Sequence, residues 1–132
     1  MGYTIKTIAQ KVGLTEYTLR YYEREGLLPL IERDENGNRN FSDQDMELIG
    51  LICCLRNTGM PLAAIKRFVT LTKGDAATIG ARKQMLIEQK QAIEEQIRQF
   101  KKYALKIDKK IAHYEELEKN GGIDRCHSDS SC

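Results

Sequence analysis

A stripe of apolar residues in the second half of the chain limits most strongly what this sequence can fold into. From Ile93 to Tyr114 its members alternate at spacings of four and three residues, and steps of seven lead back to Leu86 and Ile79. This heptad pattern predicts one helix over residues 75–120, roughly 60–70 Å long, with only Gly80 as an interruption. A helix of that length cannot fold back over so small a chain. We therefore expect its apolar seam to meet a second copy in a homodimer.

Composition narrows the class of protein. The 132 residues are 41% hydrophobic and 30% charged. No run approaches the roughly 18 apolar residues of a membrane span, and no export signal opens the chain. We expect a cytoplasmic, helix-rich protein without a membrane role. The formal net charge of +2 is too small to indicate a nucleic-acid partner by itself. Four cysteines without an export signal favour buried thiols, metal ligands or redox chemistry over a disulfide framework.

Two short helices are predicted at residues 5–25. Thr4 can cap a helix that begins at Ile5, and Gly13 can end it. Thr15 can cap a second helix, which Gly26 stops. Two short helices joined by a tight glycine-containing turn form a helix-turn-helix pattern.

The second of these helices has two different faces. Leu19 and Tyr22 can pack against the first helix, whereas the opposite face gathers arginine and tyrosine: Tyr17, Arg20, Tyr21 and Arg24. Guanidinium and phenol groups on an exposed helix suit base edges, phosphates and sugars. The alternative is an ordinary solvated face with packed rings.

A hairpin and two further helices are predicted next. Residues 29–41 contain Asn36-Gly37, a strong turn signal, so they are expected to form a wing with Arg39 on its return strand. Ser42 opens a weak capping box for a third helix, which ends near Thr58. Pro61 suits the start of a fourth helix that runs to about Leu71.

These segments resemble the MerR family of bacterial transcription regulators over residues 2–73. The sequences that carry the resemblance are Thr-Leu-Arg-Tyr-Tyr-Glu at 18–23, Gly-Leu-Leu at 26–28, Arg-Asn-Phe at 39–41, and Leu-Arg-Asn-Thr-Gly-Met at 55–60 with Ile65. Phe41 stands where the family's wing signature usually has tyrosine.

The resemblance implies a mainly α fold. It consists of a winged helix-turn-helix DNA-binding domain (2–73), a dimerising antiparallel coiled-coil helix (75–120) and a flexible tail (121–132). It also implies a homodimer that binds a palindromic promoter in double-stranded DNA. Such a dimer activates transcription by bending and underwinding the promoter spacer, so that RNA polymerase is affected indirectly, through the promoter. The implied DNA contacts are Thr15, Tyr17, Thr18, Arg20, Tyr21, Tyr22, Arg39, Phe41, Arg56 and Lys66.

The sequence indicates less clearly which signal such a regulator senses. Cys54 immediately precedes the motif at 55–60, and this arrangement, like residues 80–83, resembles the thiol-dependent branch of the family (NmlR- and AdhR-like) that responds to aldehyde or nitrosative stress. This resemblance implies that Cys54 senses reactive electrophiles. Against it, the surrounding helix is apolar nearly all round, and a buried cysteine is commonly a small hydrophobe. Arg56 also lies nearer to Cys53 than to Cys54 in helical spacing.

Two other sensing modes are weaker. Cys126, His127 and Cys132 offer ligands for zinc or copper(I), but they follow Gly121-Gly122 in the tail. The family's metal sensors instead place paired cysteines in an ordered loop directly after the long helix. About 12 residues follow that helix here, too few for an appended small-molecule domain. We therefore expect no cofactor and no resident metal.

Other classes of protein fit the chain less well. It has no Gly-rich phosphate loop and no spaced catalytic constellation, and His113 lies beside the seam of the long helix, so we do not expect an enzyme. A coiled-coil adaptor without a DNA role would explain residues 75–120. It would leave the arginine-tyrosine helix and the following wing unexplained.

Overall fold

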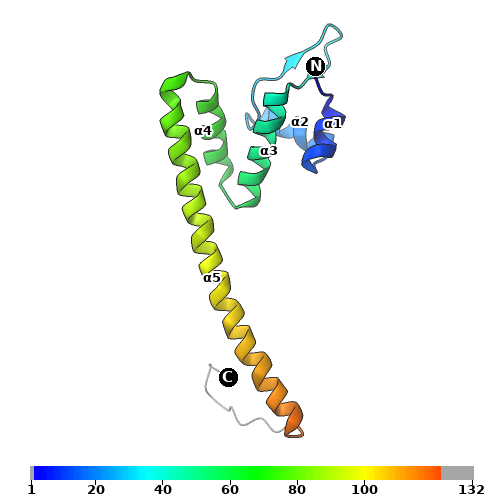
Figure 1. Cartoon of the computed structure of the whole chain (residues 1–132). Coiled ribbons are helices and arrows are strands. Elements are labelled where there is room, and N and C mark those ends of the chain that lie inside the picture. The colour runs from blue at the N-terminus through cyan, green and yellow to red at the C-terminus, as the bar shows by residue number, and fades with distance from the viewer. Residues whose placement is uncertain (1, 123–132) are drawn as a thin grey trace. The chain divides into compact units, whose positions relative to one another are not determined.

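The computed structural model describes residues 2–122 (Figure 1). The candidate metal ligands Cys126, His127 and Cys132 lie outside the described residues. In chain order the elements are α1 (Ile5–Val12), α2 (Glu16–Arg24), β1 (Glu32–Arg33), β2 (Arg39–Asn40), α3 (Asp43–Asn57), α4 (Leu62–Thr72), the 3-10 turn η1 (Ala76–Thr78) and α5 (Ile79–Lys119). Within this part of the chain, no helix has both the length and the apolar character needed to cross a membrane.

Side-chain caps define where the first three helices begin. Thr4 accepts a hydrogen bond from the Thr7 amide at the start of α1, and Thr15 accepts one from the Thr18 amide at the start of α2. Ser42 and Asp45 form the complete capping box of α3. These caps satisfy amides that have no partner within the helix, so they place α2 and α3 as the sequence predicts.

The hairpin between α2 and α3 differs in detail from a tight two-residue turn. Residues 34–38 connect its strands, and Asp34 organises this loop. The Asp34 carboxylate accepts hydrogen bonds from the amides of Asn36 and Asn38, and Gly37 has a φ of 81°. The strands pair Glu32 with Asn40 and Arg33 with Arg39. Consequently the side chains of Arg33 and Arg39 lie on the same face of the hairpin.

The hydrophobic core belongs to the unit formed by residues 2–89. It draws side chains from α1 to α4 and from the hairpin, including Ile8, Leu19, Phe41, Ile49, Ile65 and Val69. A short backbone bridge between Tyr3 and Phe41 attaches the N-terminal segment to the end of the hairpin. The first turns of α5 contribute Met85 and Leu86 to this packing.

The long helix begins four residues later than the sequence pattern predicts. Asp75 caps the 3-10 turn η1, and the α-helical hydrogen bonding starts at Ile79. From there α5 is unbroken for 41 residues, and Gly80 does not interrupt it. No residue of α5 is buried. The second unit begins at Lys90, and its seam residues, among them Ile97, Phe100, Ile107, Ile111 and Tyr114, are exposed.

Candidate nucleic-acid interface

The outward face of α2 presents the predicted polar residues. Tyr17 is 70% exposed, and Arg20, Tyr21 and Arg24 are also exposed, whereas Leu19 is buried. The Arg24 guanidinium carbon lies 6.0 Å from the centre of the Tyr21 ring, within the range of a cation–π contact. Thr15 and Thr18 are joined by their hydroxyls at the N-terminal end of this face. The outward face of this helix therefore presents two guanidinium groups and two aromatic rings to solvent.

Arg20 and Arg39 come together in one hollow, although they are far apart in sequence. This hollow of about 500 Å³ lies between the start of α1, α2 and the hairpin, and a third arginine, Arg33, lines it as well. Sequence reasoning identified Arg20 and Arg39 but missed Arg33. The pairing of Arg33 with Arg39 across the hairpin is the signal that would have found it. Three guanidinium groups around one concave surface create a favourable place for a phosphate backbone.

Two ion pairs orient these arginines. The Arg39 Nε donates to Glu23 Oε1 at 2.7 Å, which links the hairpin to α2. The Arg20 guanidinium lies 3.3 Å from Glu16 Oε1 along α2, in a more exposed setting. Phosphate oxygens or acceptor atoms of bases can replace these two carboxylates as partners of the arginines. The arginines are thus held near the hollow before any ligand arrives.

Two of the expected DNA contacts have side chains that belong to the core. Tyr22 is 5% exposed and Phe41 is 1% exposed. The Phe41 backbone pairs with Tyr3, and the Tyr22 ring lies under Arg56 at 5.8 Å from the guanidinium carbon. Tyr22 and Phe41 are therefore placed to support the outward-facing residues of α2 and the hairpin from below.

A second basic spot lies at the start of α4. Lys66 lines a hollow of about 130 Å³ together with Tyr21, Leu62 and Ala63, and the acidic Glu25 lines it as well. Pro61 precedes the helix and provides no side-chain cap. The stem of Lys66 passes close to the end of α2, since a Cβ built on Gly26 would lie 3.1 Å from its Cε. Lysine and tyrosine side chains at the start of a helix are groups that can bind a phosphate, although Glu25 reduces the positive charge of this hollow.

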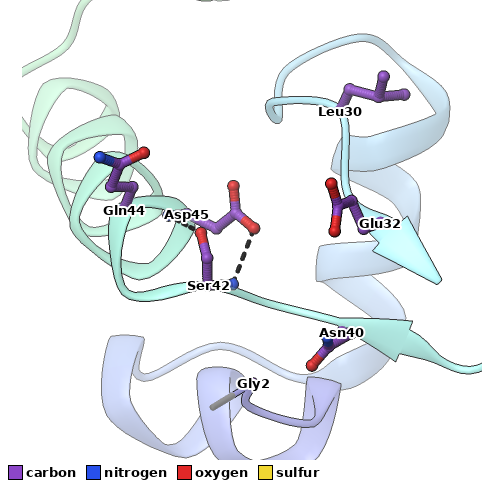
Figure 2. Close-up of a pocket in the computed structure, with 7 residues that line it drawn as sticks. All are labelled: Gly2, Leu30, Glu32, Asn40, Ser42, Gln44 and Asp45. Atoms are coloured by element: carbon purple, nitrogen blue, oxygen red, sulfur yellow. Dashed lines mark hydrogen bonds between the residues drawn. The ribbon is translucent and has the colours of Figure 1, made fainter. Parts of the chain in front are cut away.

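The opposite face of the hairpin is acidic rather than basic. Figure 2 shows Glu32, Asn40, Ser42 and Asp45 around a hollow of about 480 Å³, which sequence reasoning did not anticipate. One of its two carboxylates, that of Asp45, is engaged with the Ser42 amide. Acidic side chains repel phosphate, so this face does not suit a nucleic acid. The hairpin is therefore two-sided, with Arg33 and Arg39 on its basic face.

The two neighbouring cysteines of α3 lie in different surroundings. Cys53 is buried and Cys54 is exposed. Burial raises the pKa of the Cys53 thiol, and the nearby Arg56 partly offsets that rise. This effect of Arg56 on the pKa of Cys53 agrees with the helical spacing, which places Arg56 nearer to Cys53 than to Cys54. Both thiols line a hollow of about 470 Å³ between α1 and α3. Among the described residues, no group of three potential metal-ligating side chains comes together.

Comparison with protein families gives two matches. A family model described as "MerR HTH family regulatory protein" matches residues 3–71. A second, described as "MerR, DNA binding", matches residues 46–120. Together they extend from the helix-turn-helix through the whole of α5.

Individual relatives agree with these matches. An uncharacterized HTH-type transcriptional regulator of Haemophilus influenzae is 41% identical over 93% of this chain and 91% of its own length. The transcriptional regulator AdhR of Bacillus subtilis is 41% identical over 67% of this chain and 64% of its own. The crystal structure of HiNmlR, a MerR family regulator lacking the sensor domain and bound to promoter DNA, superposes with a TM-score of 0.81. It shares 41% identity and covers 92% of this chain and 96% of that one.

Proposed function

The chain belongs to the MerR family of DNA-binding transcriptional regulators, and from this premise we propose that it binds a palindromic promoter as a homodimer and responds to reactive electrophiles. Its similarity to HiNmlR and AdhR supports the branch of the family that the sequence around Cys54 resembles. The domain limits that go with this proposal are 2–73 for DNA binding and 75–120 for dimerisation.

The shared hollow of Arg20 and Arg39 is the observation that carries DNA binding. Arg20 projects from the exposed face of α2, the helix of a helix-turn-helix that enters the major groove. Arg39 and Arg33 extend the positive surface onto the hairpin, where a phosphate backbone or the adjacent minor groove would lie. Arginine suits both tasks, because its planar fork binds guanine edges and phosphates in a bidentate manner.

Additional phosphate contacts are proposed at the second basic spot. Lys66, the Tyr21 hydroxyl and the first-turn amides of α4 would hold the backbone beside the groove that α2 enters. Arg56 is exposed on α3, and its proposed role is a further backbone contact. Such contacts fix the position of the protein on the duplex rather than the sequence that it reads.

The homodimer is supported by the exposed seam of α5. Its large apolar side chains from Ile97 to Tyr114 follow the heptad spacing and have no cover within the described chain. Burying a large apolar side chain is worth roughly 1.5–3 kcal/mol, so pairing two such seams is strongly favoured over leaving them in water. An antiparallel pairing would present two basic heads to the two halves of a palindrome.

Activation would follow from deformation of the promoter. Two heads fixed to opposite half-sites can impose a bend and an underwinding on the intervening spacer. Smooth bending of such a site costs about 1–6 kcal/mol, which the phosphate and base contacts of both heads offset. The altered spacer would then let RNA polymerase engage both promoter elements, so that its involvement is indirect.

Cys54 is the proposed sensor of aldehyde or nitrosative stress. Its thiol is exposed and lies on the hollow between α1 and α3, next to the helix-turn-helix. Cys53 is less suited, since burial disfavours its thiolate, the reactive form. Modification of Cys54 would change the contacts of α3 close to the DNA-binding elements.

Titration of the full chain onto fluorescent promoter duplexes tests the DNA-binding part. We expect tighter binding to the palindromic promoter than to a scrambled duplex, and an affinity that falls steeply with salt as phosphate contacts are lost. An affinity that is equal for both duplexes and does not change with salt would contradict the proposal and indicate a coiled-coil adaptor.

Promoter transcription in vitro tests the sensing part. Formaldehyde, methylglyoxal or a nitrosothiol should induce transcription with the wild type and with Cys53→Ala, but not with Cys54→Ala. An undiminished response of Cys54→Ala would refute the sensing role of this thiol.

A further inference from the structure

A lysine joins the two cysteines in lining the hollow between α1 and α3. Lys11, from the last turn of α1, lines it together with Cys53 and Cys54 of α3. Lysine carries its amine on a flexible four-carbon stem, and Lys11 is exposed. One lysine and two cysteines therefore border one space of about 470 Å³, contributed by two helices that are separate in sequence, and the flexible lysine stem can bring its amine into that space.

We propose that Lys11 is the second nucleophile of the sensor, and that small aldehydes of the formaldehyde class join Cys54 Sγ to Lys11 Nζ through a single carbon. This inference rests on the proposed sensing role of Cys54 and adds the residue that completes the reaction. It also limits the substrate class to aldehydes small and reactive enough to be attacked twice at the same carbon.

The chemistry is balanced without an oxidant or a reductant. The Cys54 thiolate attacks the aldehyde carbon, the carbonyl oxygen takes up a proton, and an S-hydroxymethyl group forms when the aldehyde is formaldehyde. The neutral Lys11 amine then replaces the hydroxyl at that carbon, which leaves as water while the nitrogen gives up a proton. The product is a thiol-to-amine methylene bridge, and the protein gains one carbon atom net.

Cys54 is the thiol that this reaction uses, because the two cysteines differ in access. Cys54 is exposed, whereas Cys53 is buried and burial raises its pKa. A thiol held in its protonated form inside the core is a poor nucleophile. Cys54 and Lys11 are both exposed, so a dissolved aldehyde can reach this pair without entering the core.

A bridge at this place would act on four helices. It ties α1 of the helix-turn-helix to α3, and Thr58, which lines the same hollow, accepts a hydrogen bond from Gln89 of α5 at 2.8 Å. On the inner side of α3, Cys53 lies close enough to Tyr22 of α2 to influence its pKa. The buried Tyr22 hydroxyl has no hydrogen-bond partner among the described residues, so a small shift of this ring would break no hydrogen bond of its hydroxyl.

Intact-mass and peptide mass spectrometry of the full chain after formaldehyde treatment test the inference. The wild type should gain one carbon atom and yield a crosslinked peptide pair that joins Cys54 to Lys11. Lys11→Arg keeps the positive charge but lacks a nucleophilic amine, so it should stop at the S-hydroxymethyl stage and gain a whole formaldehyde. Lys6→Arg is the matched control, because Lys6 is exposed on the same helix but does not line the hollow.

Transcription assays separate this inference from the function on which it rests. We expect Lys11→Arg to lose most of the response to formaldehyde while keeping its response to a nitrosothiol, which needs the thiol alone. If Cys54→Ala loses both responses but Lys11→Arg keeps both and no bridge forms, the Lys11 inference is overturned and the sensing role of Cys54 stands. If Cys54→Ala keeps both responses, the proposed sensing function itself fails.

Discussion

The Arg39 guanidinium on the hairpin and the Glu23 carboxylate on α2 form an ion pair, with Nε and Oε1 2.7 Å apart. Both side chains are about four-fifths buried, so solvent screens this contact less than a fully exposed pair. The pair links the two elements whose arginines share the basic hollow. Glu23 therefore contributes a side-chain link between the hairpin and α2, in addition to the packing of the buried Phe41.

Replacing that carboxylate tests its positioning role. Glu23→Gln removes the charge but keeps the shape and one acceptor oxygen, so the fold should lose about 1–3 kcal/mol of stability. Promoter affinity should fall up to about tenfold, because Arg39 is no longer held toward the hollow. Fluorescence anisotropy with a promoter duplex measures the affinity, and thermal unfolding measures the stability.

The matched control for this variant is Glu16→Gln. Glu16 pairs with Arg20 in a more exposed setting within the same helix, so its loss leaves the wing in place. We expect a smaller change in affinity than for Glu23→Gln. Equal losses would show that the link between hairpin and helix has no special effect.

Arg20 should be essential for reading the promoter. Arg20→Ala removes a guanidinium from the exposed face of α2, and a good bidentate base contact is worth about 1–3 kcal/mol of discrimination. We expect loss of operator binding with an unchanged sedimentation coefficient, since α5 is untouched. Lys73→Ala, which removes an exposed charge at the end of α4, is the control. Unchanged binding by Arg20→Ala would mean that this arginine does not face the groove.

Local signals in the sequence were sufficient to place most elements. Thr4, Thr15 and Ser42 are capping residues three positions before an amide that needs a partner, and each caps its helix in the structure. The turn glycines Gly13 and Gly26 have the positive φ values that end α1 and α2 in the expected places. Because such signals act within a few residues, they can be recognised without knowledge of the tertiary fold.

Features that depend on tertiary packing were harder to predict. For Tyr22 the helix-face pattern predicts packing against the first helix and the family resemblance implies a DNA contact, and the structure agrees with the packing, since Tyr22 is buried. Arg33 joins the basic hollow only because the hairpin register sets it opposite Arg39. The hollow shared by Lys11 and Cys54 arises where α1 meets α3, which no local pattern encodes.

The seam of α5 offers a closely matched comparison between two side chains. Ile107 lies on the heptad stripe and Leu105 does not, yet they are 61% and 62% exposed. Ile107→Lys should weaken the dimer by several kcal/mol, because two copies of a side chain worth roughly 1.5–3 kcal/mol each are lost. Leu105→Lys should leave it intact. Sedimentation equilibrium measures both, and equal effects would contradict the predicted seam.

The stability of the fold at alkaline pH should depend on Cys53. Burial holds the pKa of this thiol above its ordinary value of 9.0, with Arg56 acting in the opposite direction. Below pH 9 the thiol is protonated in both the folded and the unfolded chain, so its contribution to stability is fully present. As the pH rises further, the unfolded chain releases this proton first, and stability is lost up to and through the higher folded pKa.

Cys53→Ala removes this titration. The variant should start about 1 kcal/mol less stable near pH 7, because a buried sulfur atom is lost. Between pH 9 and 10.5 it should then lose less stability than the wild type, so that the two curves converge. Tyr22, whose pKa burial also raises, is present in both proteins, and its own effect largely cancels in the difference. Denaturant unfolding at a series of pH values measures the two curves, and parallel curves above pH 9 would show that the Cys53 thiol is not held protonated by the core.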